Sequence, residues 1–226
     1  PTAPLAQTLN RVYQGLTVMG SIVLNNSVGG INPDAVEASA QLGARVVWMP
    51  TLDVDDYSSE QCAKRAIRLT DQTGRLTREV HDVLDIVANQ DLLLASGHLS
   101  YSAALQLFNE AKSKGVERMI ATHGAGRTTI EEQRKLTAIG AYVEYTFLDC
   151  MPSVARCSPQ GMVTAIRAVG LESVVLTTDF GQLSNPPAAE GMRMAIAALL
   201  EEGMNTRDVE ILVKKNPLQL VQESTC

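Results

Sequence analysis

The sequence alternates short apolar runs with longer segments of helical periodicity, and this alternation constrains the fold more than any other feature. A helical pattern follows each apolar run. Short continuous apolar runs are typical of buried parallel strands, and strands that alternate with helices indicate a parallel sheet. We therefore predict an α/β fold. The predicted strands are 17–24, 45–49, 91–95, 118–122, 141–147 and 173–178.

The helical segments carry terminal signals that support this pattern. Asn32 precedes Pro33, and Thr128 and Thr129 precede Glu131 and Glu132 at the spacing of a capping box. Gly115, Gly140 and Gly170 each follow a helical run, where a left-handed C-cap favours glycine. The predicted helices are 4–14, 33–42, 76–89, 101–114, 129–139, 158–169, 188–202 and 206–214.

Three of the predicted strands end on a side chain that can bind a metal. The runs DLLLASGH, ERMIATHG and SVVLTTDF end at or next to His98, His123 and Asp179. In a TIM-type barrel the active site lies at the C-terminal ends of the strands. Because zinc binds imidazole nitrogen and carboxylate oxygen, these residues predict a metal site at one mouth of the barrel. The alternatives are a hydrogen-bonded structural role for each histidine and a capping or loop role for Asp179.

Length, charge and cysteine spacing argue against several classes of protein. A chain of 226 residues is predicted to form a single domain, 1–226. Its net charge of −6, without a basic cluster, argues against nucleic-acid binding. No uncharged apolar run is long enough to span a membrane, and the N-terminal segment lacks the pattern of a signal peptide. The four cysteines show no CxxC spacing, so we expect reduced thiols in a cytoplasmic protein.

One segment interrupts the alternation. Residues 50–75 are long, polar and acidic. Long loops in compact domains are often lids or binding loops, so this segment is predicted to be a loop excursion or lid with a short helix around 58–66. A solvated insertion without a role in binding is the alternative.

Several segments together resemble a known superfamily. SIVLNNSVGGINPDAVEASAQLGARVVWMPTLD, LLLASGHLS, MIATHGAG, VVLTTDFGQLSNPPAAEGM and VKKNPLQL are similar to the amidohydrolase superfamily, in particular to a branch of amidohydrolase-like proteins of unknown function. The resemblance begins at about residue 15 and covers essentially all of the chain from there. It implies a (β/α)8 barrel that holds one or two divalent metals.

The resemblance also implies roles for individual residues. His98 matches the histidine on the fifth strand of the superfamily, His123 the histidine on the sixth, and Asp179 the aspartate on the eighth. That aspartate is both a metal ligand and the base that takes a proton from the attacking water. The superfamily also has a His-x-His pair on its first strand, and this sequence has none. The chain therefore resembles a member that begins after the first two strands.

Other residues are candidates for the same site. Glu144 lies inside a predicted strand, where a buried charge requires a partner, so an ion pair and a site role are both open. Gly124, Gly126 and Arg127 precede a predicted helix and could bind an anion, although the glycines could serve only a tight turn. Asn25 ends the first predicted strand and is placed at the rim.

The strand count predicts association between chains. A barrel of this type has eight strands, and we predict about six, so the barrel is expected to be N-terminally short. Open sheet edges and uncovered apolar faces favour pairing with another chain. We therefore expect a homo-oligomer, or association with a segment that supplies the absent strands, near 17–24 and 173–178.

The leading interpretation is a metal-dependent hydrolase, with zinc as the favoured divalent metal. Water activated by the metal would attack an amide, ester, lactone or phosphoester of a small-molecule substrate. The second interpretation is a degenerate, non-catalytic barrel that acts as a binding or assembly partner, as the missing His-x-His suggests. The third is a metal-free lyase or isomerase that binds an anion at Gly124–Arg127.

Overall fold

The computed structural model describes residues 1–54 and 66–221 of the chain. The chain separates into two compact units, 1–120 and, among the described residues, 121–221. The prediction of one barrel domain over 1–226 stays a prediction, and each unit is described by itself. The predicted short helix around 58–66 falls almost entirely in 55–65, outside the described residues.

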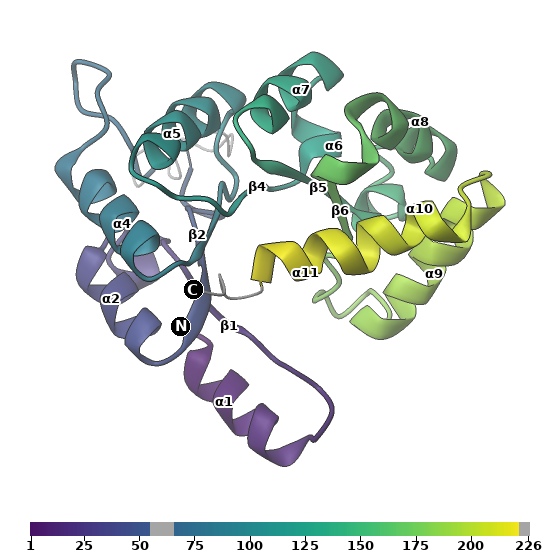
Figure 1. Ribbon diagram of the computed structural model, residues 1–226, viewed down its shortest axis with the longest axis horizontal. Coiled ribbons are helices and arrows are strands. Elements are labelled where there is room, and N and C mark those ends of the chain that lie inside the picture. The colour runs from purple at the N-terminus through teal and green to yellow at the C-terminus, as the bar shows by residue number, and fades with distance from the viewer. Residues whose placement is uncertain (55–65, 222–226) are drawn as a thin grey trace. The chain divides into compact units, whose positions relative to one another are not determined.

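The first unit contains four strands that pair in parallel in chain order (Figure 1). The pairs Val23–Trp48, Trp48–Ala95 and Ala95–Ile120 lie opposite one another across the sheet. The strands are β1 (Gly20–Val23), β2 (Ala44–Trp48), β3 (Leu93–Ala95) and β4 (Met119–Ala121). The helices are α1 (Ala3–Val12), α2 (Pro33–Gln41), α4 (Arg78–Asn89) and α5 (Tyr101–Ser113), and η1 (Asn26–Val28) is a short 3₁₀ turn.

The apolar faces of these helices form the core of the first unit. Val80, Val83, Leu84 and Val87 of α4 are all fully buried. Their spacing of three and four residues places them on one side of the helix. Strands β3 and β4 are buried on both faces, as their continuous apolar sequence predicts, whereas β1 and β2 are partly exposed.

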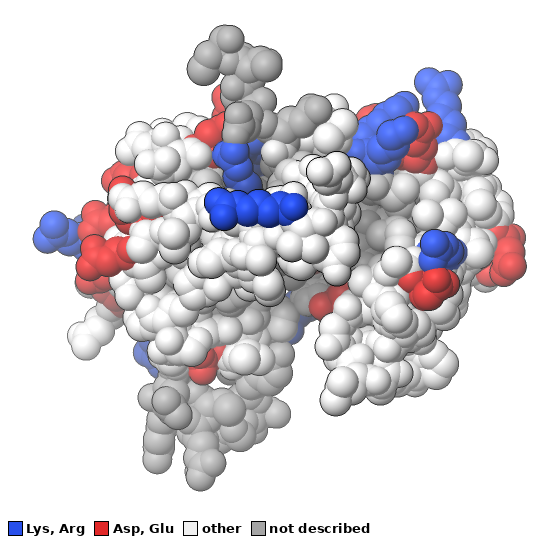
Figure 2. Space-filling model, turned by 90° about the horizontal axis from the view of Figure 1, so that it is seen from below, with Lys and Arg blue, Asp and Glu red and all other residues white. Residues whose placement is uncertain are grey.

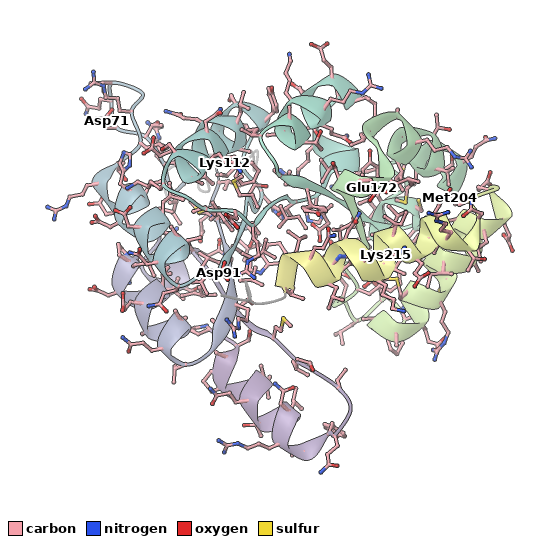
Figure 3. The ribbon with its side chains drawn as sticks, viewed as in Figure 1. Asp71, Asp91, Lys112, Glu172, Met204 and Lys215 are labelled. Atoms are coloured by element: carbon pink, nitrogen blue, oxygen red, sulfur yellow. The ribbon has the colours of Figure 1, made fainter. Side chains whose placement is uncertain are left out.

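The second unit is built around two parallel strands, β5 (Tyr142–Thr146) and β6 (Val174–Thr177). The helices are α6 (Gly124–Arg127), α7 (Ile130–Ala138), α8 (Pro159–Val169), α9 (Ala188–Glu201), α10 (Thr206–Glu210) and α11 (Asn216–Val221). Short turns η2 (Phe147–Cys150) and η3 (Leu171–Ser173) follow β5 and precede β6. The core packs both strands against α8 and α9, and Met204, which follows α9, is buried in it (Figure 3).

A buried amide anchors the C-terminal helices to the start of β6. A π-helical segment, η4 (Ile211–Lys215), joins α10 to α11, and the three form one rod, yellow in Figure 1. Asn216 is buried, and its Nδ2 donates hydrogen bonds to the carbonyls of Leu171 and Val174, at 2.7 and 2.6 Å. The start of β6 is therefore fixed against the last helix.

The predicted α/β fold and its elements are confirmed. Each strand of the described sheet overlaps a predicted one, and each predicted helix that falls within the described residues is present, whereas the short helix around 58–66 stays a prediction. The N-cap of α2 is Asn32, which accepts a hydrogen bond from the backbone of Ala35, and Thr129 and Glu132 form the predicted capping box on α7.

The described part of the 50–75 segment includes an ordered turn. Asp71 Oδ1 accepts hydrogen bonds from the backbone and hydroxyl of Thr73 and from the backbone of Arg75, at 2.8, 2.7 and 3.1 Å (Figure 3). These bonds, that of the Thr73 hydroxyl first, lower the pKa of Asp71. Thr70 and Leu76 form an antiparallel bridge across the turn.

The surface carries both signs of charge. On the face in Figure 2, basic and acidic side chains are interspersed. Exposed ion pairs one helical turn apart, such as Lys135–Glu131 and Lys214–Glu210, also place opposite charges next to each other on the helices. Among the described helices, none is long and apolar enough to cross a membrane.

Gly97 marks a close approach of two strand ends in the first unit. Its backbone has φ +58°, and a Cβ there would lie 2.2 Å from the carbonyl oxygen of Met49. The next residue, His98, donates its backbone N–H to the carbonyl of Pro50 at 2.9 Å. A glycine is therefore required to place His98 against the end of β2.

We predict that Gly97→Ala lowers the free energy of unfolding by more than about 2 kcal/mol. The strain of a left-handed alanine backbone adds to the clash of its Cβ with the Met49 carbonyl. The matched control is Gly115→Ala, at φ +86° with nothing within 4 Å of the added Cβ. That variant should lose only about 1 kcal/mol, the cost of the left-handed backbone. Urea unfolding of both variants measures the difference, and equal losses would contradict the close approach.

Candidate functional site

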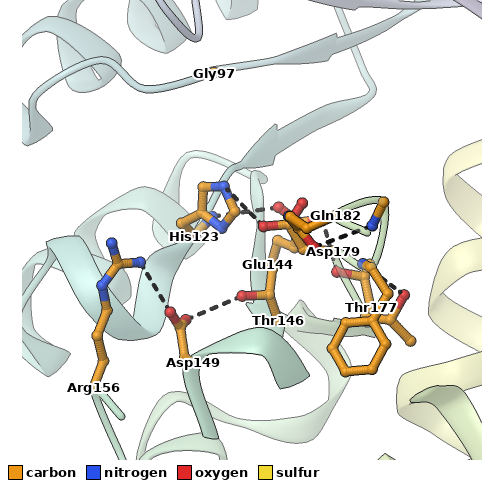
Figure 4. A network of polar contacts seen from close by, with 12 residues as sticks. Gly97, His123, Glu144, Thr146, Asp149, Arg156, Thr177, Asp179 and Gln182 are labelled. Atoms are coloured by element: carbon orange, nitrogen blue, oxygen red, sulfur yellow. Dashed lines mark hydrogen bonds and ion pairs between the residues drawn. The ribbon is translucent and has the colours of Figure 1, made fainter. Parts of the chain in front are cut away.

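His123 and Asp179 meet in the second unit (Figure 4). His123 follows β4, and Asp179 follows β6. His123 Nε2 lies 3.9 Å from Asp179 Oδ2, and their side chains are 11% and 40% exposed. The site is therefore open to solvent on the side of the carboxylate and closed on the side of the imidazole.

Both residues have a left-handed backbone. The φ of His123 and of Asp179 is +54°. This conformation is uncommon for residues other than glycine and costs about 1 kcal/mol or more. Asp91 and Ala155 also adopt it, so it is not restricted to the site. At His123 and Asp179 it turns the chain sharply where the strand ends, which directs both side chains to the same place.

The loop that carries Asp179 is fixed on both sides. Before it, the carbonyl of Thr178 accepts a hydrogen bond from the backbone of Leu148 at 3.1 Å. After it, the backbone of Phe180 donates to Thr178 Oγ1 at 3.3 Å, and the ring of Phe180 lies 6.5 Å from that of Phe147. The position of the carboxylate is thus set by neighbours in the core.

Glu144 lies next to His123 and holds its backbone in place (Figure 4). Its Oε2 accepts a hydrogen bond from the backbone N–H of His123 at 3.3 Å, and its Oε1 accepts one from Thr177 Oγ1 at 3.0 Å. Glu144 is buried, and this burial raises the pKa of its carboxyl to about 7. One side chain therefore links the residues that follow β4 with β5 and β6.

Asp149 and Arg156 form an ion pair beside this group. Asp149 is fully buried, and its Oδ1 accepts a hydrogen bond from Arg156 Nη1 at 3.0 Å. Its Oδ2 accepts one from Thr146 Oγ1 at 3.1 Å. Both carboxylate oxygens have partners, as a buried charge requires.

Burial sets the protonation of the two central groups. It lowers the pKa of His123, against the opposite effect of the nearby Asp179 carboxylate. It raises the pKa of Asp179, against the effect of His123. The imidazole is therefore held neutral, the form in which a histidine nitrogen can bind a metal or accept a proton.

The side chains of His123 and Asp179 are of the types that bind a divalent metal, but they are fewer than the ligands of a catalytic zinc site. Neutral imidazole and carboxylate are zinc ligands, and a 3.9 Å separation is shorter than two zinc–ligand bonds placed end to end, about 4.2 Å. A catalytic zinc site has three protein ligands. Among the described residues, no group of three or more His, Cys, Asp and Glu side chains is placed to hold one ion.

The GAGR segment forms the short helix α6. A Cβ on Gly124 would lie 2.1 Å from Val143 Cγ1, so glycine is needed for the helix to pack on β5. Gln133 Nε2 donates to the carbonyl of Gly124 at 3.0 Å, and Tyr145 donates its hydroxyl to Gln133 Oε1 at 2.6 Å. Gly126 and Arg127 belong to the same helix, and an anion site there stays a prediction.

Two predicted site residues belong to the first unit. His98 lines a cavity of about 310 Å³ together with Arg68, Thr70, Ser100 and Gln106. Asn25 is buried and holds the segment after β2, because its Oδ1 accepts hydrogen bonds from the backbone of Thr51 and Leu52 at 2.8 and 3.1 Å. The role of His98 as a metal ligand stays a prediction.

Sequence reasoning missed Asp149, Arg156 and Thr177. Asp149 follows an apolar strand, which is the signal that identified His123 and Asp179, but it lies three residues beyond the end of β5 inside η2. Thr177 ends β6 two residues before Asp179. A search for polar residues on either side of each strand end would have found both.

The family model described as "Family of unknown function (DUF6282)" matches residues 1–144. This is more than half of the chain. The chain belongs to the DUF6282 family. None of the curated proteins compared with this DUF6282 chain matches it.

Solved structures share the fold of the DUF6282 chain at low sequence identity. An amidohydrolase from Pseudomonas aeruginosa is 13% identical, with a TM-score of 0.62 over 97% of this chain and 82% of that one. The putative 2-pyrone-4,6-dicarboxylic acid hydrolase from Pseudomonas putida is 16% identical, with a TM-score of 0.61 over 97% and 77%. The phosphotriesterase homology protein from Escherichia coli is 15% identical, with a TM-score of 0.54 over 98% and 90%. The DUF6282 chain therefore has the α/β fold of TIM-barrel hydrolases.

We predict that Glu144→Ala in the DUF6282 chain lowers the free energy of unfolding by about 1–3 kcal/mol, because the buried N–H of His123 and the partly buried hydroxyl of Thr177 lose their acceptor. Glu144→Gln should lose less than about 1 kcal/mol, since its amide can accept from His123 N–H and donate to Thr177 Oγ1. Chemical denaturation measures both, with the exposed Glu202→Gln as control. Equal losses for the two Glu144 variants would contradict the bridging role.

Proposed function

We propose that this chain is a metal-dependent hydrolase of the amidohydrolase type, acting on an amide, ester, lactone or phosphoester of a small molecule. The observation that carries the proposal is the pairing of His123 Nε2 with Asp179 Oδ2 at 3.9 Å, just after β4 and β6 of a hydrolase-type fold. A carboxylate next to a neutral imidazole can hold a water molecule and remove its proton.

Asp179 is the proposed proton acceptor. It is the more exposed member of the pair, and its raised pKa brings a carboxylate closer to the basicity that proton transfer needs at neutral pH. The attacking water would lose its proton to Asp179 as its oxygen bonds to the carbonyl carbon or phosphorus. Asp179 would then return the proton to the leaving group.

The neighbouring residues position this pair. Glu144 holds the backbone of His123 and so fixes the direction of the imidazole. The Asp149–Arg156 pair places the 47% exposed guanidinium side chain at the edge of the group, where it could contact an anionic part of a substrate. Neither Glu144 nor Asp149 is expected to exchange protons with the substrate, because both are buried.

The proposed metal would be held by His123 and Asp179, with His98 as the predicted third ligand. Such an ion, with zinc favoured, supplies Lewis-acid activation of water and of the carbonyl or phosphoryl oxygen. Burial of the imidazole supports this assignment, because a neutral nitrogen is required of a ligand.

We predict that Asp179→Asn lowers kcat/KM by at least about 100-fold, because the amide cannot accept a proton while its shape is nearly unchanged. Hydrolysis of a p-nitrophenyl ester, a lactone and a dialkyl aryl phosphate by the wild type identifies the substrate for this comparison. The control is Asp34→Asn, an exposed carboxylate of the first unit, which should keep wild-type activity. Unchanged turnover in Asp179→Asn, with the fold intact by circular dichroism, would remove the proposed base.

We predict that the purified protein carries about one zinc per chain, and that His123→Ala and Asp179→Ala each reduce it to trace levels, because a site that loses one ligand binds far more weakly. His98→Ala tests the third ligand by the same elemental analysis. His81→Ala is the matched control, since His81 pairs with Glu110 at 3.2 Å on the helix surface. Zinc retained in both the His123 and Asp179 variants would contradict the assignment. A wild type with neither metal nor turnover would favour a non-catalytic binding role.

A further inference from the structure

Two cysteines of the second unit lie in contact. The Sγ atoms of Cys150 and Cys157 are 3.5 Å apart, and both residues are half-buried. Cys150 ends η2, and Cys157 directly precedes Ser158, the N-cap of α8. A disulfide requires an S–S distance of about 2.05 Å, so the two sulfurs need to approach by only about 1.5 Å.

The backbone holds this approach in place. The N–H groups of Arg156 and Cys157 both donate to the carbonyl of Asp149, at 2.9 and 3.2 Å. Within the loop, Val154 and Ala155 donate to the carbonyl of Met151, at 2.9 and 2.7 Å. The two ends of the loop are therefore hydrogen-bonded to each other independently of the thiols, and closure requires no large rearrangement.

We propose that Cys150 and Cys157 form a reversible intramolecular disulfide, which makes this loop a redox-sensitive modification site. The oxidant is a small disulfide such as oxidised glutathione. Two protein thiols and one oxidised glutathione give one protein disulfide and two reduced glutathione molecules, so that two electrons pass from the protein to the oxidant.

The order of steps follows from the environment of the thiols. The contact between the two thiols lowers the pKa of Cys157 and raises that of Cys150. Cys157 is therefore the attacking thiolate and forms a mixed disulfide, releasing the first glutathione, which takes up a proton from solvent. Cys150 then attacks the Cys157 sulfur and loses its proton to the second glutathione as that leaves.

The modification would affect the neighbouring ion pair. Asp149 directly precedes Cys150, and Arg156 directly precedes Cys157. Drawing the sulfurs together moves the residues that carry the 3.0 Å contact between the Asp149 and Arg156 side chains. An effect on hydrolysis rests on the proposed function, whereas disulfide formation itself does not.

The sequence offers a direct test of the linkage. Trypsin cleaves after Lys135, Arg156 and Arg167, so it separates the two cysteines into peptides 136–156 and 157–167. The native protein is equilibrated with oxidised glutathione, its remaining thiols are alkylated, and it is digested without reductant. We expect the two peptides to be recovered mainly as one linked species, which dithiothreitol separates.

Two sets of variants control the result. Cys150→Ser and Cys157→Ser should each abolish the linked species, whereas the double variant Cys62→Ser, Cys226→Ser should keep it. Recovery of both peptides only in alkylated form, or only as mixed disulfides with glutathione, would overturn the proposal. A linked species found only in covalent dimers on a non-reducing gel would also overturn it, because the disulfide would then join two chains.

Discussion

The geometry of the candidate site depends on one buried carboxyl group. Glu144 lies inside β5, accepts a hydrogen bond from the backbone after β4, and accepts another from the last residue of β6. An apolar residue at this position would leave a buried N–H and a hydroxyl without acceptors. Burial raises the pKa of Glu144 to about 7. The direction of His123, and with it the distance to Asp179, follows from this contact.

The strand ends could be predicted because burial and chain direction both produce recognisable patterns in the sequence. Continuous apolar runs identified the strands, and a polar residue at the end of a run identified His123 and Asp179. The residues that were not predicted are brought together where the chain folds back on itself within a few residues. Arg156 reaches Asp149 only because the intervening loop closes on the carbonyl of Asp149. Neither residue has a periodic signal that indicates this pairing.

The α6 segment shows a second limit of sequence reasoning. Two glycines in four residues disfavour a helix, and the GAGR sequence predicted an anion site or a tight turn instead. Tertiary contacts reverse this preference. Gly124 fits against Val143 where no larger residue would, and Gln133 and Thr128 both donate side-chain hydrogen bonds to its carbonyl. The preference of the local sequence is outweighed by packing against a strand that is adjacent only in three dimensions.

The alternation of side chains along β5 has a consequence for how this sequence can change. Glu144 and Thr146 contact the polar group, whereas Val143 and Tyr145 contact α6 and α7. An insertion or deletion of a single residue within β5 would exchange these two sets, placing a carboxylate in the helix layer and a tyrosine in the site. The length of this strand is therefore constrained as strictly as its composition. Divergence in this region can proceed by substitution but not by a change of one residue in length.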